Sequence, residues 1–438
     1  MTVISGGEFD AYWKQRRTAR EDSAVSQAVS GVIAAVRREG DAAVRRFAAE
    51  FDKSSPERLE VPLALAEAGY RRLLETDPVL VAALESAAER VRRFAEQQKA
   101  QCRDFECETA PGLIAGQRVI PVRRAGVYVP AGRFPLISSV LMGVIPALVA
   151  GVAEVCLVSP PLEDGLPDPR ILGAARLAGV SRIFAVGGAQ AVAALAFGTE
   201  TIPQADVIVG PGNKYVAAAK RLLAGVAGID FVAGPTDVLI ISDGDPDLIA
   251  ADMLAQAEHD PEARSRAIVP DKALADQTLR RLEARLAGLP TAAVAEASLA
   301  AGGLIVISAD PEASAGIANT IAPEHLELHV QDTAFWIPRL YNYGSLFIGS
   351  ASAEVLGDYT AGINHTLPTS GCARFTGGLS VRHFLKFLTT LRCSPDTGWT
   401  EALRGAERIA SAEGLAAHRE SASRRLSGFD KTDIPILK

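Results

Sequence analysis

The chain has 438 residues but only five cysteines and six histidines. The cysteines are odd in number and widely scattered in a large chain, which is not the pattern of a disulfide-stabilised scaffold. Cys102 and Cys107 are also too far apart for a CxxC metal site. We therefore expect a reduced, cytoplasmic protein.

Long runs of lysine or arginine are absent, and the net charge is -7. Nucleic-acid binding needs a basic surface, so no nucleic-acid partner is expected. The first residues are polar and charged and lack the apolar core of a signal peptide. The one long uncharged stretch, residues 134–153, is interrupted by Pro135 and Pro146. It predicts a buried helix that leads into a strand, and no membrane span.

The pattern of apolar residues changes at about Arg118. Before it, residues repeat at helical spacing; after it, short runs of Val and Ile alternate with helical segments. Such alternation is typical of parallel sheets covered by helices on both faces. We predict an α/β fold with two Rossmann-like parallel-sheet domains, an N-terminal helical region and a small C-terminal helical domain that includes a helix over Val381–Thr390. The predicted boundaries are 1–115, 116–235, 236–370 and 371–438.

Three glycine-containing loops follow predicted strands: Tyr128–Arg133, Val186–Gln190 and Val209–Asn213. Ligands bind beyond the carboxyl ends of strands in open parallel sheets, and glycines let backbone amides approach a phosphate there. No loop has the GxGxxG pattern, and no acidic residue is placed for a ribose. Ordinary strand-to-helix turns have the same composition. A fourth loop, Ala233–Asp237, leads into a strand, where the Thr236 hydroxyl reaches a ligand or caps a turn.

Side chains that can bind metal gather in the second half of the chain. Gln256 and His259 are three residues apart at the end of a predicted helix and share one of its faces. Together with Asp358 and His418 they would form a nitrogen and oxygen site that suits Zn²⁺, and also Mn²⁺ or Co²⁺. A surface glutamine and an ordinary helix-end histidine would look the same. Spacing does not separate ligands from catalytic residues.

Glu324 and His325 are adjacent and follow Pro323. One could move a proton to or from an alcohol while the other activates water, although the start of a surface helix has the same composition. His365, and Glu413 near the C-terminus, are further polar candidates. His329 and His383 are given no role and are expected to be surface or packing residues.

Together these motifs resemble the histidinol dehydrogenase family, in order and at similar spacings, from about Arg124 to the C-terminal helix. The matching segments are GVYVPAGRFPLISSVLM, AVGGAQAVAALAFGTETI, VGPGNKYVAAAK, IDFVAGPTDVLI, DMLAQAEHDPEA, IAPEHLEL, GDYTAGINHTLPTSG and AEGLAAH. The resemblance implies a zinc-dependent homodimer that uses NAD twice. It would oxidise the amino alcohol L-histidinol, through the bound aldehyde, to L-histidine.

The resemblance also implies roles for individual residues. NAD would contact the first Rossmann-like domain, through Tyr128, Gln190 and Asn213. The metal and the catalytic pair Glu324 and His325 would belong to the second. The implied zinc ligands, which also contact substrate, are Gln256, His259, Asp358 and His418. The other implied substrate contacts are Thr236, His325, His365 and Glu413. The C-terminal element would dimerise, so that Glu413 and His418 act across the interface.

Some positions depart from the family pattern. Ala131 stands where the family usually has Gly, and Thr236-Asp237 replaces the usual Ser-Glu. Segments near residues 342 and 374 resemble paralogues that oxidise other primary alcohols to acids, such as sulfopropanediol dehydrogenase. A zinc hydrolase without NAD is a further alternative, against which the glycine loops argue. A non-catalytic homologue is another, although the residues that the chemistry needs are all in the sequence.

Overall fold

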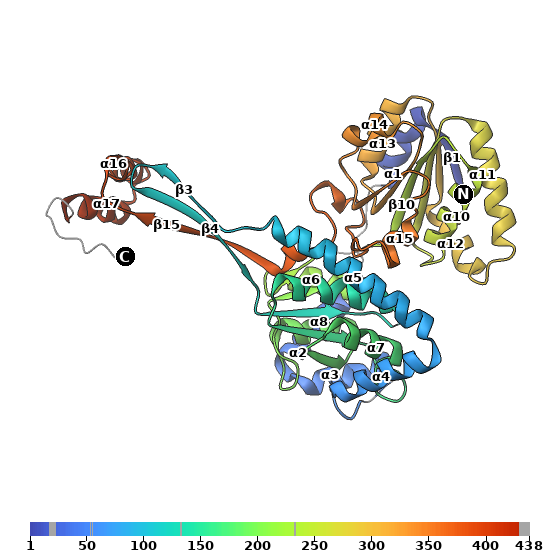
Figure 1. Cartoon of the computed structure of the whole chain (residues 1–438), viewed down its shortest axis with the longest axis horizontal. Coiled ribbons are helices and arrows are strands. Elements are labelled where there is room, and N and C mark those ends of the chain that lie inside the picture. Colours follow the sequence, from blue (N-terminus) through green and yellow to red (C-terminus); the bar gives the residue numbers. More distant parts are fainter. Residues whose placement is uncertain (17–22, 53, 55, 132–133, 232–233, 429–438) are drawn as a thin grey trace. The chain divides into compact units, whose positions relative to one another are not determined.

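The computed structural model describes residues 1–16, 23–52, 54, 56–131, 134–231 and 234–428. Arg133 and Ala233, each in one of the predicted loops, lie outside these residues. The chain divides into two compact units. The first unit comprises Met1–Gln98 and Val122–Phe384, and the second Lys99–Pro121 and Leu385–Lys438 (Figure 1).

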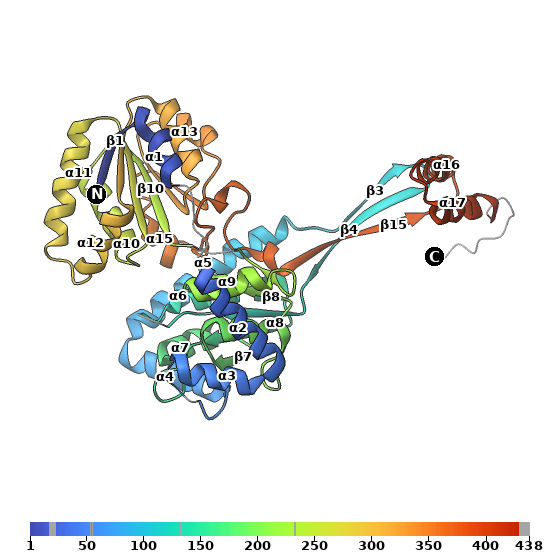
Figure 2. The same cartoon turned by 180° about the vertical axis from the view of Figure 1, so that it is seen from behind.

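The first unit contains two large sheets with helices on both faces (Figures 1 and 2). In the first sheet, the order is β2 (Glu60–Val61), β7 (Arg182–Ala185), β6 (Glu154–Ser159), β5 (Arg124–Tyr128), β8 (Val207–Val209) and β9 (Gly228–Ile229). Only β2 is antiparallel to its neighbour. Its helices are α2 (Ser23–Glu39), α3 (Asp41–Phe47), α4 (Leu63–Thr76), α5 (Pro78–Ala100), α6 (Ile137–Ala150), α7 (Pro169–Ala178), α8 (Gly188–Phe197) and α9 (Lys214–Leu223).

The second sheet is parallel throughout, in the order β1 (Thr2–Ser5), β12 (Leu304–Ile307), β11 (Arg264–Val269), β10 (Asp237–Ser242), β13 (His325–His329) and β14 (Ser345–Ile348). Its helices are α1 (Phe9–Arg16), α10 (Pro246–Ala257), α11 (Lys272–Leu286), α12 (Ala292–Gly302), α13 (Pro311–Ile321), α14 (Thr333–Trp336) and α15 (Glu354–Tyr359). In both sheets the chain reverses its direction of winding once, between β5 and β8 and between β10 and β13. This order is that of doubly wound nucleotide-binding folds.

Alternating side chains on the central strand fill two separate cores. Val238 and Ile240 on β10 pack with α10, α11 and α12, whereas Leu239 and Ile241 pack with α1 and α13 on the other face. Strand geometry sends successive side chains to opposite faces, so a strand that is covered on both sides is apolar throughout. The mixed α/β fold with parallel sheets that the sequence predicted is confirmed.

The second unit is built on a three-stranded antiparallel sheet of β3 (Phe105–Ala110), β4 (Leu113–Pro121) and β15 (Leu385–Cys393), with α16 (Thr397–Ala412) and α17 (Ala416–Gly428). The predicted helix over Val381–Thr390 is wrong, because most of it is β15. The strand pairs with β4 from Leu385↔Pro121 to Cys393↔Leu113. A partner more than 260 residues earlier in the chain overrides the local pattern.

Two short strands of the N-terminal region belong to the large sheets. β1 pairs with β12 at the edge of the second sheet, and β2 pairs with β7 at the edge of the first. The helical pattern of residues 1–115 did not indicate this. Within the described residues, no helix is both long and apolar enough to cross a membrane.

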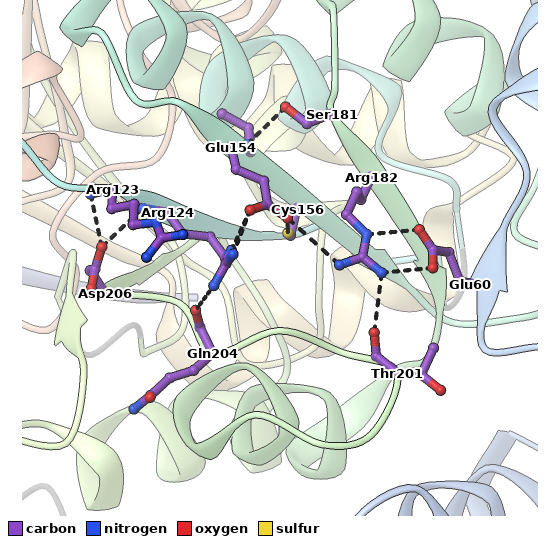
Figure 3. A network of polar contacts seen from close by, with 11 residues as sticks. Glu60, Arg123, Arg124, Glu154, Cys156, Ser181, Arg182, Thr201, Gln204 and Asp206 are labelled. Atoms are coloured by element: carbon purple, nitrogen blue, oxygen red, sulfur yellow. Dashed lines mark hydrogen bonds and ion pairs between the residues drawn. The ribbon is translucent and has the colours of Figure 1, made fainter.

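The amino edge of the first sheet is closed by a network of ion pairs (Figure 3). Arg124 at the start of β5 donates from Nε to Glu154 at 2.7 Å and from Nη1 to the carbonyl oxygen of Gln204 at 2.8 Å. Arg182 on β7 makes a two-bond contact with Glu60 on β2, both bonds at 2.7 Å. These contacts tie the four neighbouring strands together and leave the carboxyl edge as the open one.

Replacing Arg124 with Ala is expected to lower the free energy of unfolding by about 1–2 kcal/mol, because charged hydrogen-bond partners at the strand ends lose their donor. The matched control is Arg93→Ala on α5. Arg93 pairs with Glu89 at a site where the two side chains are 74% and 60% exposed, so it should cost about 0.5 kcal/mol or less. Urea-unfolding midpoints would compare the variants. Equal midpoints would contradict a stabilising role for the network.

Candidate active site

A cavity of 1210 Å³ lies in the first unit and is lined from both sheets and their helices. Five of the residues singled out from the sequence line it: Tyr128, Gln190, Asn213, His259 and Asp358. The first three come from the first sheet and its helices, and the last two from segments of the second. The cavity therefore joins the loops predicted to bind a cofactor to the residues predicted to bind metal.

On the first-sheet side, the loops follow the carboxyl ends of the strands. Tyr128 ends β5, and its hydroxyl accepts a hydrogen bond from the Gly188 N–H at 3.2 Å, where α8 begins. Asn213 caps α9 by accepting hydrogen bonds from the N–H groups of Tyr215 and Val216. Gly210 has a φ of +116°, and a Cβ there would lie 2.2 Å from the Tyr128 carbonyl oxygen. The close approach of the two loops thus requires glycine.

Gln190 is fully buried, and its Oε1 has no hydrogen-bond partner among the described residues. Its Nε2 donates to Asp52 at 3.4 Å. Asp52, which follows α3, also lines the cavity, and burial raises its pKa to about 6. The sequence did not identify this carboxylate, since it comes from a helical segment 138 residues before Gln190.

On the second-sheet side, the predicted residues gather at the amino edge. Thr236 precedes β10, Glu324 precedes β13, and Gln256 lies in the last turn of α10. His259 lies two residues beyond the end of that helix. The expectation that ligands bind at the carboxyl ends of strands thus describes the loops of the first sheet. It does not describe the candidate residues of the second sheet, which lie at the amino edge.

Hydrogen bonds fix Glu324 at this edge. Its Oε2 accepts from the Thr236 hydroxyl at 2.5 Å and from the Asp237 N–H at 3.0 Å. In return, the Glu324 N–H donates to Asp237 Oδ1 at 2.6 Å. Thr236 also accepts a hydrogen bond from Gln256 Nε2 at 2.8 Å. One hydroxyl therefore links the predicted water-activating carboxylate to a predicted metal ligand.

The environment of Glu324 favours its protonated form. Burial is the largest cause and raises its pKa to about 7, against the lowering effects of the His325 charge and the Thr236 hydrogen bond. A carboxyl group with this pKa is poised to exchange a proton near neutral pH.

His325 lies between two carboxylates. Its Nδ1 is 3.3 Å from Glu354 and its Nε2 is 3.5 Å from Asp358, and neither nitrogen has a well-formed hydrogen bond. Burial lowers its pKa, but the charges of Glu354 and Glu324 outweigh burial and raise the pKa well above its usual value. Glu354 is a second residue that the sequence did not identify; its position at the start of α15 brings it to β13.

Four residues of this site offer ligand atoms to a divalent cation, and three of them, His259, Glu354 and Asp358, place those atoms close together. Gln256 is fully buried, and its Oε1 has no partner among the described residues. His259 Nε2 lies 4.0 Å from Asp358 Oδ2. Atoms of His259, Glu354 and Asp358 all lie within 4.8 Å of one another. An unpaired amide oxygen, an imidazole and a carboxylate are suitable ligands for Zn²⁺.

His365 lies beside this group without lining the cavity. Its Nδ1 is 2.7 Å from the Asp358 carbonyl oxygen and its Nε2 is 3.2 Å from the Ser139 hydroxyl. Both ring nitrogens therefore have partners within the protein. Glu413 and His418 belong to the second unit, in the connection and helix that follow α16, and both are exposed.

Comparisons with known proteins agree along the whole chain. The histidinol dehydrogenase family model matches residues 15–426. A histidinol dehydrogenase of Thermus thermophilus is 46% identical over 408 residues, which cover 93% of this chain and 96% of that protein. One of Methylococcus capsulatus is 45% identical over 411 residues, or 93% of each chain. A crystal structure of histidinol dehydrogenase from Elizabethkingia anophelis superposes with a TM-score of 0.90 at 34% identity and covers 98% of both chains. The chain therefore belongs to the histidinol dehydrogenase family of oxidoreductases.

Proposed function

We propose that the protein oxidises L-histidinol to L-histidine in two successive NAD-dependent steps, with Zn²⁺ in the site and the aldehyde held between steps. The carrying observation is the buried Glu324–His325 pair, in which His325 Nε2 lies 3.5 Å from Asp358, a residue that lines the cavity. The opposite wall of the same cavity carries Tyr128, Gln190 and Asn213. A four-electron oxidation needs proton transfer, water activation and a nicotinamide at one place, and the proposal assigns these tasks to the buried pair and to the cavity that Asp358 lines.

In the first oxidation, His325 would take the alcohol proton as its neutral form, which a bound cation favours against the carboxylates that raise its pKa. The imidazole is buried, so the proton is passed within a site that excludes bulk water. The carboxylates of Glu354 and Asp358, 3.3 and 3.5 Å from its two nitrogens, stabilise the imidazolium that forms. The nicotinamide of NAD supplies the hydride acceptor when it is bound.

In the second oxidation, Glu324 activates water for attack on the aldehyde. Its carboxylate is held by the Thr236 hydroxyl and the Asp237 N–H, and a pKa of about 7 lets it take a proton from water and return it. Retaining the aldehyde in an enclosed cavity prevents loss of a reactive intermediate.

Zn²⁺ would be held by Gln256, His259 and Asp358 of one chain and by His418 of the partner chain. When bound, it would supply a fixed positive charge that orients the imidazole and amine of the substrate and opposes protonation of His325. Gln256 is already aligned for this task, because Nε2 is engaged by Thr236 and only Oε1 remains free. Glu354 is the ligand from the same chain that would compete with His418 for the fourth position.

NAD would lie along the first-sheet wall. The N–H groups of Gly188 and Gly210 already donate to Tyr128 and Asp230, so a diphosphate would meet the later N–H groups in the first turn of α8. Asp52 beside Gln190 offers the carboxylate that ribose hydroxyls require, which the sequence lacked in its usual place. The carboxylate also opposes a 2′-phosphate, so NAD is favoured over NADP.

A homodimer would complete the site through Glu413, which would face the substrate amine, and His418. The second unit exposes many large apolar side chains, which is unusual for a surface that remains in water. They are Phe105, Phe387, Leu388, Leu391, Ile409 and Leu415. A second copy of the chain would cover them. All five cysteines are free, and we propose a cytoplasmic location.

The departure at Thr236 leaves the proposed substrate unchanged. The hydroxyl is used inside the protein, as acceptor from Gln256 and donor to Glu324, and serine offers the same hydroxyl. The replacement of Glu by Asp237 likewise retains a carboxylate, here bound to Arg266 at 3.1 Å. If histidinol were not oxidised, we would propose a different primary alcohol as the substrate.

The two proton-transfer residues should affect different steps. His325→Asn is expected to slow oxidation of the alcohol by about 10²–10⁴-fold, the usual contribution of a general base. Glu324→Gln should stop the reaction after the first step, so that NADH per histidinol falls from two toward one and trapped aldehyde accumulates. The control is Glu262→Gln, an exposed carboxylate. Stopped-flow NADH formation with alcohol and with aldehyde would measure both. Equal impairment of both steps in both variants would refute the division of roles.

Aldehyde oxidation should increase with pH. Below its pKa, Glu324 is protonated and cannot take a proton from water, so kcat/KM for the aldehyde should rise with a midpoint no higher than about 7. A bound cation nearby can only lower that midpoint, since it favours the carboxylate. Glu324→Gln should lose the rising limb. A wild-type midpoint above 8, or the same limb in the variant, would contradict the assignment.

Mixed dimers would test the shared metal site. His259→Asn and His418→Asn should each abolish tight zinc binding and activity alone. If His418 acts across the interface, a dimer with one chain of each kind has one site with both histidines intact. Zinc content and NADH formation should then recover to about half the wild-type value. Mixed dimers as inactive as both parents would show that His418 does not act in trans.

A further inference from the structure

A second group of metal-binding side chains lies outside the active site. Asp252 on α10 and Glu327 and His329 on β13 place ligand atoms within 4.8 Å of one another. His329 Nε2 is 3.4 Å from Glu327 Oε2 and 3.9 Å from Asp252 Oδ2. We propose that these three residues bind a second divalent cation, separate from the proposed zinc at Gln256, His259 and Asp358.

The spacing around His329 suits a metal better than a hydrogen-bonded cluster. Ligand bonds of about 2.1 Å in a tetrahedral site place ligand atoms about 3.4 Å apart. A direct hydrogen bond between the same groups would bring them to about 2.7–3.0 Å. His329 lies 3.4 and 3.9 Å from the two carboxyl groups, beyond direct hydrogen bonds and at or above the metal-ligand spacing, whereas Asp252 and Glu327 are hydrogen-bonded to each other.

Most of the atoms that would bind the ion have no other partner, although the Asp252 and Glu327 side chains share a hydrogen bond. Glu327 is fully buried and His329 is 95% buried, with 5% of its surface exposed. Glu327 Oε2 and both ring nitrogens of His329 lack hydrogen bonds among the described residues. Buried polar atoms that remain unpaired are costly, and a bound ion or a water molecule satisfies them. Glu327 Oε1, in contrast, accepts from the Glu354 N–H at 2.6 Å, which holds the carboxylate in place.

The position in the fold also points to a ligand. On β13, Leu326 and Leu328 pack into the core on one face, so His325, Glu327 and His329 lie on the other. His329 is the last residue of β13 and pairs with Ser242 at the end of β10. The gap between these two strands at their carboxyl ends is where the winding reverses, which is the usual ligand position in doubly wound sheets. The active site uses the amino edge of this sheet, so this position is otherwise unassigned.

Burial disfavours the charged forms of both carboxyl groups, so a cation bound there would displace the proton that they hold. Burial raises the pKa of Glu327 to about 8 and that of Asp252 to about 6, and the proximity of Asp252 adds to the first shift. Two carboxylates and one imidazole suit Zn²⁺ or Mn²⁺. Asp252 keeps 9% of its surface exposed, which leaves water access for entry and for a further ligand.

The ion would connect the second site to the first. Asp252 and Gln256 are four residues apart and share a face of α10, while Glu327 and His325 are two apart and share a face of β13. A cation between Asp252 and Glu327 would therefore fix the distance between the helix that carries Gln256 and the strand that carries His325.

Metal counting on the full-length protein tests the inference. Chelator-stripped protein would be loaded with Zn²⁺ or Mn²⁺, freed of excess ion and analysed by mass spectrometry. Wild type should hold two ions per chain, whereas Glu327→Gln and Asp252→Asn should each hold one. His259→Asn should also hold one, and its double variant with Glu327→Gln should hold none. Asp247→Asn, an exposed carboxylate on the same helix, is the matched control and should hold two.

Thermal melting checks separately that the Glu327→Gln variant folds. Glutamine keeps the oxygen that accepts from Glu354 and offers an N–H to His329, so metal-free Glu327→Gln should melt no lower than metal-free wild type. In the His259→Asn background, added ion should raise the melting temperature, and Glu327→Gln should remove that rise.

The counts also separate this inference from the proposed function. If wild type holds one ion that is lost in His259→Asn and kept in Glu327→Gln, the second site is overturned while the proposed zinc stands. Asp252, Glu327 and His329 would then be a proton-sharing cluster. If the single ion is lost in Glu327→Gln and kept in His259→Asn, the second site is supported and the zinc of the proposed function fails.

Discussion

The reciprocal hydrogen bonds between Asp237 and Glu324 are the contact on which the candidate site depends. Each residue stands at or just before the first position of a strand, and each uses its backbone N–H to bind the carboxylate of the other. The pair thereby fixes the amino ends of β10 and β13 against one another. Asp237 is itself held by the buried Arg266, so the arrangement has a charge partner on the neighbouring strand β11. Without this anchor, a carboxyl group with a pKa near 7 would relax toward water and lose the environment that tunes it.

The two halves of the cavity use opposite ends of two sheets with the same strand order. On the first sheet, the carboxyl edge offers glycine turns and helix N-termini. On the second, the amino edge offers the end of α10 and the residues that precede β10 and β13. The fold alone would direct attention to carboxyl edges in both cases. The polar face of β13, which runs from His325 through Glu327 to His329, spans the second sheet from one edge toward the other.

Much of this could be predicted from the sequence, for physical reasons that differ between elements. The sequence predicts central strands such as β10 correctly, because burial on both faces makes them continuously apolar. The sequence named Glu324 and Gln256 as candidates but could not show that they lie together. Thr236 links them, and it is 88 residues from Glu324 and 20 from Gln256 in the chain. Glu354, Asp52 and β15 were missed for one shared reason. Their partners are distant in sequence, and nothing in their own neighbourhoods marks them.

His329 shows a further limit of sequence patterns. Its sequence context suggested a surface or packing residue, and the structure buries it with two unpaired ring nitrogens beside two carboxylates. Alternation along β13 explains the position, because a strand with Leu at every second residue must send the others to the opposite face. Periodicity predicts which side a residue faces, but the chemistry it meets there depends on the helix that covers it.

The third sheet has a consequence for how the chain matures on the ribosome. β3 and β4 are made early, whereas their partner β15 begins only at Leu385, after every strand of the two large sheets has been translated. The nascent chain must therefore carry a two-stranded ribbon that is exposed and partly apolar through the synthesis of more than 260 residues. Such unpaired edges are prone to aggregation, so this segment is a natural client for a chaperone. Assembly of the second unit, and of any oligomer built on it, is necessarily a late event.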